Sequence, residues 1–258
     1  MTWNPRKKNY LNQKPSAAPP LLSVAEDRDL NLAVQRLMHV EGTIRKLTKE
    51  TKRYLEAISN LDRADQRLTA NLSSCELAHI DDEFRHIVEE YLTITTQVGK
   101  TVQDLTLLSQ KTFIEPLKKL REEFSLIAEA LAKREELVTS WKTAHNRYKK
   151  LQEKKDKTAS HVVKLEREKR AEELAAKELK SIHSRLLLEL PWFLEKRLEY
   201  IKPSINALIM IQLDYYGNTM QLFNQLMPSS GGYTSDDEDT IVNEQFNRIK
   251  SLTIVKDH

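Results

Sequence analysis

Apolar residues recur at intervals of three and four along most of the chain, in three successive stretches. The first runs from about Val24 to Leu72, and its spacing predicts a helix with one buried stripe. The second runs from Phe84 to Tyr148, and the third from about Val162 to Leu226. The pattern therefore predicts three long helices, with a short break around residues 71–82 and a turn between the second and the third helix.

Prolines fall inside two of these helices without disturbing the apolar spacing. Pro116 lies in the second helix, and Pro191 and Pro203 lie in the third. Because proline removes one backbone donor and clashes with the preceding turn, we expect a bend at each site rather than an end. At about 1.5 Å per residue, helices of roughly 70 residues span on the order of 100 Å. The sequence thus predicts an all-α fold: a long, proline-bent, three-helix antiparallel coiled coil.

The third helix is apolar over much of its circumference in its second half. Residues 186–226 hold 23 hydrophobic side chains out of 41, whereas residues 146–180 hold 11 out of 35. A helix of this kind must be covered on more than one side, and two other helices of the same chain supply too little cover. We therefore expect a two-fold homodimer. Its predicted interface residues are Leu190, Phe193, Leu198, Ile201, Ile205, Leu208, Tyr215 and Leu222.

The composition supports a helical protein of a reducing compartment. Five glycines in 258 residues are too few for a sheet protein with regular turns. The single cysteine, Cys75, excludes a disulfide framework. The longest purely apolar run, residues 207–211, is far shorter than the ~20 residues of a membrane span. We expect a cytoplasmic protein whose contact with any membrane is peripheral.

Positive charge is concentrated at the turn between the second and third predicted helices. The whole chain carries a formal charge of +3, but residues 142–170 hold 11 basic and four acidic residues. Such a cluster attracts an anionic lipid surface, although an ordinary solvated coiled-coil surface is the alternative interpretation. Nucleic acid is not expected as a partner, because the cluster contains one aromatic residue and no recognition module. The basic residues are Lys142, Arg147, Lys149, Lys150, Lys154, Lys155, Lys157, Lys164, Arg167, Lys169 and Arg170.

No arrangement of residues in the sequence predicts catalysis. Two Glu-x-x-His units, Glu76 with His79 and Glu83 with His86, have a spacing that helical di-iron proteins use. They fall at the break between helices, however, and no matching acidic pair lies on an apolar face elsewhere. We expect no enzyme activity, no metal and no cofactor. A metal enzyme built on a helical bundle and a coiled-coil scaffold that acts through protein partners remain the rival interpretations.

Several segments resemble the BAR domain family. FIEPLKKL (113–120) resembles the proline bend in the second BAR helix, and the stretch 190–226 resembles the final BAR helix. RYKKLQEKKDK (147–157) is similar to the lysine-rich arm tips of amphiphysins. The two ends, Met1-Thr2-Trp3 and residues 249–255, resemble those of the bridging-integrator-3 group and its short fungal relatives, which are BAR proteins without an SH3 module.

The resemblance implies a domain organisation and a function. Composition predicts a basic, proline-rich flexible arm at 1–22 and an acidic flexible tail at 228–258, and the resemblance implies a BAR domain at 23–227 between them. The resemblance also implies a crescent-shaped homodimer with a central six-helix bundle that senses or induces curvature on anionic membranes. The implied roles lie in endocytosis, actin organisation or cytokinesis, with possible cytoskeletal partners and a possible heterodimer with another BAR protein. Lys118 and Lys119, beside the proline bend, are further candidate lipid contacts.

Overall fold

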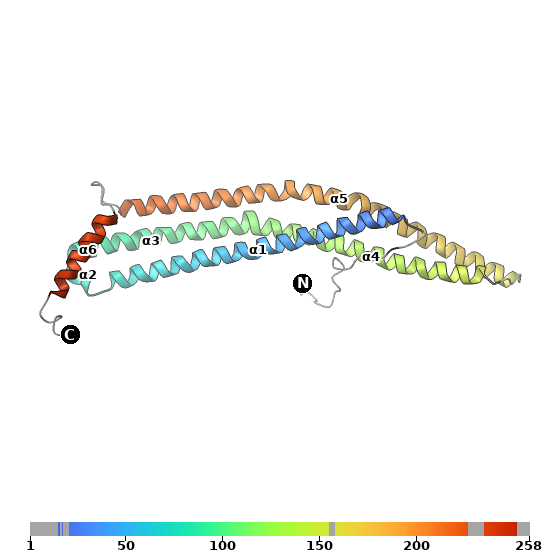
Figure 1. Ribbon diagram of the computed structural model, residues 1–258, viewed down its shortest axis with the longest axis horizontal. Helices are drawn as coiled ribbons and strands as arrows, with labels where there is room; N and C mark the ends of the chain where they lie inside the picture. The colour runs from blue at the N-terminus through green and yellow to red at the C-terminus, as the bar shows by residue number, and fades with distance from the viewer. Residues whose placement is uncertain (1–14, 16, 18–20, 155–157, 227–234, 252–258) are drawn as a thin grey trace. The chain divides into compact units, whose positions relative to one another are not determined.

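The computed structural model describes residues 15, 17, 21–154, 158–226 and 235–251, and these contain helices and connections but no strand. The predicted all-α class is therefore confirmed. The predicted arm at 1–22 lies mostly outside the described residues. In chain order the elements are α1 (Val24–Ser73), α2 (Leu77–Ile80), α3 (Asp82–Ser109), the π-helical turn η2 (Gln110–Ile114), α4 (Glu115–Gln152), α5 (Ala159–Phe223), the 3-10 turn η3 (Asn224–Leu226) and α6 (Ser235–Lys250) (Figure 1).

The predicted break after the first helix is present, and an aspartate caps the helix that follows. The Asp81 carboxylate accepts hydrogen bonds from the backbone N–H groups of Glu83 and Phe84, at 2.8 and 3.2 Å. These two N–H groups belong to the first turn of α3, where no backbone partner exists. The side chain of Asp81 thus fixes the start of α3.

The second predicted helix passes Pro116 without ending, as the sequence indicated. The turn before the proline is π-helical, and the N–H of Glu115 is bonded to the carbonyl of Gln110, five residues back. One extra residue in a turn accommodates a proline ring, because it moves the preceding carbonyls away from the ring. Phe113 and Ile114 of this turn are buried. Likewise α5 continues through Pro191 and Pro203.

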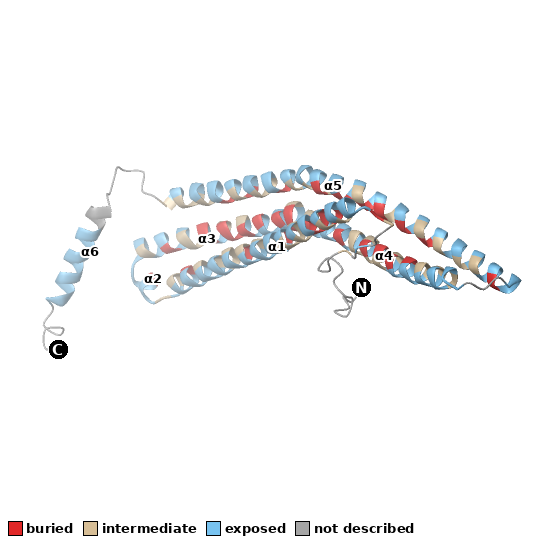
Figure 2. Cartoon of the chain, turned by 45° about the vertical axis from the view of Figure 1, so that its right-hand side comes forward, coloured by how far each residue is buried: buried red, intermediate tan, exposed pale blue. Residues whose placement is uncertain are grey.

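The chain divides into two compact units: residues 1–64 with 99–216, and residues 65–98 with 217–258. In the first unit α4 and α5 run antiparallel, and the same alignment of their residues holds along the whole contact. Phe124 packs edge-on against Phe193, with ring centroids 5.4 Å apart. Further along, Nδ1 of His145 lies 2.9 Å from the Glu172 carboxylate. The buried residues line the facing sides of both helices (Figure 2).

A buried arginine ties α1 to this helix pair. The side chain of Arg134 is fully buried. Its guanidinium donates hydrogen bonds to the carboxylates of Asp27 and Glu135, each at 2.6 Å, and to Nδ1 of His183 at 3.3 Å. Nε2 of the same histidine lies 4.0 Å from the Glu26 carboxylate. This network joins α1, α4 and α5 at one point.

In the second unit, the ends of α1 and α5 pack on the first half of α3. The hydroxyls of Thr69 and Thr95 are hydrogen-bonded to each other at 3.1 Å, and both side chains are buried. The rings of Tyr91 and Phe223 lie 6.4 Å apart. These contacts hold three helix segments side by side within this unit.

Within the predicted tail, residues 235–250 form the helix α6. Ile241, Val242, Phe246 and Ile249 are spaced so that they share one face of this helix. Arg248 and Lys250 stand in its last turn, where positive charge favours a helix end. A count of acidic residues missed this amphipathic pattern.

Replacing Arg134 by alanine should strongly destabilise the chain. The change leaves the Asp27 carboxylate without its guanidinium partner, and breaking a buried pair in this way costs about 3–5 kcal/mol of unfolding free energy. Urea unfolding followed by circular dichroism measures the loss. The matched control is Lys133→Ala, which removes an exposed pair with Glu136 and should change stability little. An equal effect of both substitutions would contradict the buried network.

Lowering the pH should weaken the chain through His183. Burial, and then the nearby Arg134 guanidinium, lower the pKa of this histidine, although Asp27 and Glu26 partly oppose the shift. The unfolded chain therefore takes up the proton first, so stability falls as the pH drops below about 6.5. Unfolding free energies of wild type and His183→Gln should approach each other between pH 7.5 and pH 5. A constant difference across that range would refute the assignment.

Candidate functional site

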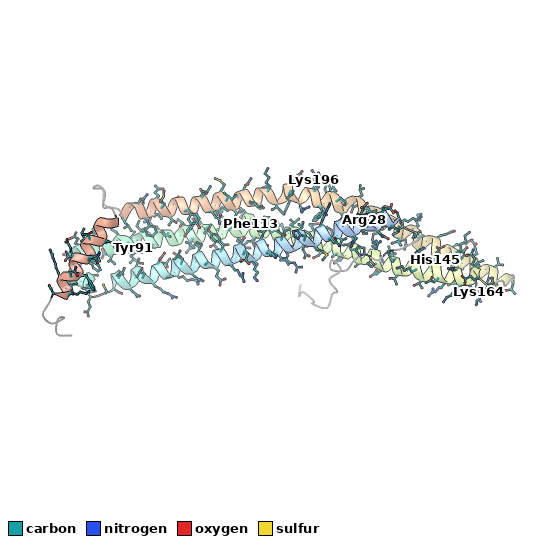
Figure 3. The ribbon with its side chains drawn as sticks, viewed as in Figure 1. Arg28, Tyr91, Phe113, His145, Lys164 and Lys196 are labelled. Carbon is teal, nitrogen blue, oxygen red and sulfur yellow. The ribbon has the colours of Figure 1, made fainter. Side chains whose placement is uncertain are left out.

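The cations of the predicted cluster lie at the junction of α4 and α5, which we call the arm tip (residues 142–154 and 158–170). Figure 3 shows Lys164 there, close to the labelled His145. Lys155 and Lys157 lie outside the described residues. Every other predicted cation of the cluster is exposed: Lys142, Arg147, Lys149, Lys150, Lys154, Lys164, Arg167, Lys169 and Arg170.

The antiparallel register brings the end of α4 beside the start of α5. His145 meets Glu172 at 2.9 Å, and the Arg134 guanidinium meets His183 at 3.3 Å. A step of 11 residues along α4 is thus matched by 11 residues back along α5. The antiparallel pairing therefore brings the cations at the end of α4 and those at the start of α5 together on one short segment of the molecule.

Most of these charges have no acidic partner among the described residues. Arg170 pairs with Glu166 at 3.1 Å, and Lys169 lies 3.9 Å from Glu173. Among the described residues these are the only ion pairs that lysines or arginines of the arm tip form. The remaining seven cations concentrate positive potential at the end of two helices. Such a surface binds anions.

Lys118 and Lys119 are exposed, but they do not belong to this cluster. They stand beside Pro116 on α4, next to the buried Leu117. At 1.5 Å per residue, roughly 36 Å of helix separates them from Lys142. They form a separate, smaller basic site.

A second surface is apolar and lies along α5. Leu186, Leu190, Leu194, Ile211 and Tyr215 are buried on one side of this helix. Helical spacing places a second stripe from the flank of this buried face round to its opposite side, and its members are exposed. This exposed stripe within the first unit consists of Trp192, Leu198, Ile205, Ile209, Leu213 and Tyr216.

The stripe only partly coincides with the predicted dimer residues. Leu198 and Ile205 are exposed on it, whereas Leu190 and Tyr215 are only 2% and 8% exposed and pack inside the chain. The other four, Phe193, Ile201, Leu208 and Leu222, are half-buried. Four exposed members of the stripe, Trp192, Ile209, Leu213 and Tyr216, are not among the predicted residues. Projecting α5 at 100° per residue would have separated the two stripes.

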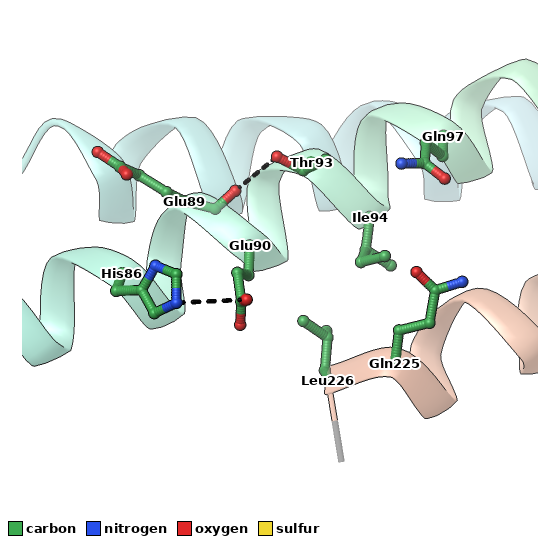
Figure 4. Close-up of a pocket in the computed structure, with 8 residues that line it drawn as sticks. All are labelled: His86, Glu89, Glu90, Thr93, Ile94, Gln97, Gln225 and Leu226. Atoms are coloured by element: carbon green, nitrogen blue, oxygen red, sulfur yellow. Dashed lines mark hydrogen bonds and ion pairs between the residues drawn. The ribbon is translucent and has the colours of Figure 1, made fainter. Parts of the chain in front are cut away.

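The described residues offer no metal centre. No group of three or more histidine, cysteine, aspartate or glutamate side chains among them could hold an ion. His86 lies 3.4 Å from Glu90 instead of meeting a second carboxylate. It lines an open hollow between α3 and η3 in the second unit, where Gln225 and Leu226 form the other wall (Figure 4). The arrangement is one ordinary surface ion pair.

None of the described helices is both long enough and apolar enough to cross a bilayer. This result concerns the described helices alone. The two surfaces with a marked chemical character are therefore the basic arm tip and the exposed stripe of α5.

Comparisons with known proteins agree with this architecture. A profile of the BAR domain matches residues 23–231. Bridging integrator 3 of Mus musculus is 25% identical over 259 residues, covering all of both chains. A Candida albicans protein named regulator of cytoskeleton and endocytosis is 24% identical over 238 residues, covering 89% of each chain. The solved amphiphysin BAR domain from Drosophila is similar with a TM-score of 0.60 and 14% identity, covering 87% of this chain and 98% of that chain.

The profile match covers most of the chain, and the described helices form the coiled coil that such domains share. The predicted family resemblance is thereby confirmed. The chain belongs to the BAR domain family.

Proposed function

We propose that this chain is a peripheral membrane protein that binds anionic bilayers through its arm tips and senses or induces their curvature as a homodimer. The observation that carries the proposal is the set of seven exposed cations without ion pairs at the arm tip. Each basic residue near an anionic leaflet contributes about 1 kcal/mol of attraction. Several together suffice for reversible binding.

Dimerisation strengthens this attraction, and it supplies the pair of linked tips that curvature sensing requires. The exposed stripe of α5 lies outside the face that packs inside the chain, and apart from the contact of Tyr216 with Tyr54 of α1 its side chains remain largely exposed. A second copy related by a two-fold axis covers the same stripe on both subunits. Two linked tips then bind one membrane with a raised effective concentration. A rigid pair of tips favours bilayers whose curvature matches their spacing.

The proposed cellular setting follows the relatives. One of them is named a regulator of cytoskeleton and endocytosis, which supports a role for this chain in endocytosis, actin organisation or cytokinesis. We propose a cytoplasmic location at membranes, and a heterodimer with another BAR protein as an alternative to the homodimer.

Charge reversal at the arm tip should abolish vesicle binding. Replacing Lys149, Lys150, Lys154 and Lys164 by glutamate removes four attractions of about 1 kcal/mol each and adds repulsion, so affinity should fall at least 100-fold. Co-sedimentation with vesicles containing phosphatidylserine measures it. Lys177→Glu with Lys180→Glu, further along α5, is the control that should retain most binding. Wild-type binding that ignores both anionic lipid and salt would favour a protein scaffold instead.

An acidic residue on the exposed stripe should separate the dimer. Ile209→Asp with Leu213→Asp puts charge on side chains that are exposed in the single chain, so the monomer fold tolerates it. In a dimer interface the unpaired charges would be buried at high cost. Light scattering should give the 30.0 kDa monomer. The control Leu174→Asp changes an exposed leucine of the same helix and should leave the dimer mass unchanged. A persistent dimer would place the interface elsewhere.

A further inference from the structure

Two exposed valines stand in the first turn of α5, at the arm tip. The side chains of Val162 and Val163 are 56% and 69% exposed. Elsewhere on the arm tip the exposed residues are almost all polar or charged. The pair is therefore a small apolar element in the most basic part of the molecule.

The helical spacing puts cations beside Val163, whereas Val162 has Glu166 four residues on. Val163 shares a face with Arg167 and Arg170, four and seven residues on, and it precedes Lys164. Lys164 and Arg167 form none of the ion pairs seen in the described part of the chain. The valine pair is thus bordered, on the side of Val163, by positive charge that acidic side chains leave mostly uncompensated.

No acidic side chain stands in the first turn of α5. The nearest on the helix, Glu166, is engaged by Arg170 at 3.1 Å. A partner of this surface must therefore offer negative groups at its edge and apolar atoms within a few ångströms behind them. The boundary between anionic headgroups and acyl chains has this composition, and amphipathic segments with cationic flanks bind there. The long stems of Lys164 and Arg167 allow their charges to remain at headgroup level while the valines lie deeper.

We propose that Val162 and Val163 insert into the headgroup–acyl boundary of an anionic bilayer, so that the arm tip is held by apolar contact as well as by charge. This inference rests on the proposed membrane function and adds a component of binding that salt does not screen. Charge attraction fades as the Debye length shortens from about 10 Å at 0.1 M salt. The free energy gained by burying apolar surface is not weakened by salt screening.

The first test compares vesicle affinities of full-length variants at about 0.1 M and about 0.5 M salt. The probe is a vesicle of phosphatidylcholine with one-third phosphatidylserine. Val162→Ser with Val163→Ser should lower affinity roughly tenfold at both salt concentrations. Leu174→Ser, which removes an exposed leucine further from the tip, should leave affinity unchanged. Equal affinities of wild type and the double valine variant would overturn the insertion while leaving the proposed function intact.

The second test reports the environment of the side chain directly. An environment-sensitive fluorophore is attached to Val163→Cys, with Leu174→Cys as the control, both in a Cys75→Ser background. On binding vesicles the label at 163 should brighten and shift to shorter wavelength, while the label at 174 should not. A water-like signal at 163 in bound protein would overturn the insertion. An equal response to polyglutamate would identify an acidic protein surface as the partner and would also overturn it.

Failure of the proposed function gives a different result. If neither the wild-type chain nor the labelled variants bind anionic vesicles at either salt concentration, the membrane function itself is wrong, and the insertion is wrong with it.

Discussion

The structure depends on one constraint: α5 carries apolar side chains on two separate faces. One side, with Leu186, Leu190 and Leu194, packs against the chain's own helices. The other side, with Ile209 and Leu213, remains exposed. A helix with apolar side chains on several faces is stable in water only when each of these faces packs against other protein surface. The inner stripe aligns α5 with α4 and so positions the arm tip, and the outer stripe is the physical reason for proposing a second subunit.

Register along the inner stripe needs more than apolar contact, because leucines at heptad spacing pack almost equally well after a slip of seven residues. Arg134 removes that freedom. Its guanidinium is fully buried, and only one register presents both Asp27 and His183 to it. A slip would leave a buried charge unpaired, which costs several kcal/mol. A buried polar network of this kind contributes more to the choice of one packing than to the strength of packing.

Apolar periodicity in the sequence was enough to predict the helices, the break before Asp81 and the continuation through Pro116, because these features follow from local spacing and backbone chemistry. The basic arm tip was predictable for the same reason, since its charges are close in sequence. The burial of Leu190 and Tyr215 within the chain could not be predicted from a count of apolar residues, because such a count contains no angular phase. Arg134 gave no signal, since arginine is normally exposed and its partners come from two other helices.

The arm tip also shows why charge and apolar exposure occur together there. Leu22, which packs with Val138, Trp141 and Leu179, brings the residues just before α1 alongside the helix pair. Beyond it, the described tip consists of α4 and α5 alone, and two helices bury only the side chains that face each other. Among the described residues between 142 and 170, only His161 is buried. Hydrophobic burial therefore stabilises this segment little, and its outward residues are free of packing demands. Such a segment tolerates uncompensated cations and exposed valines, and both features are those that an interfacial contact with a bilayer requires.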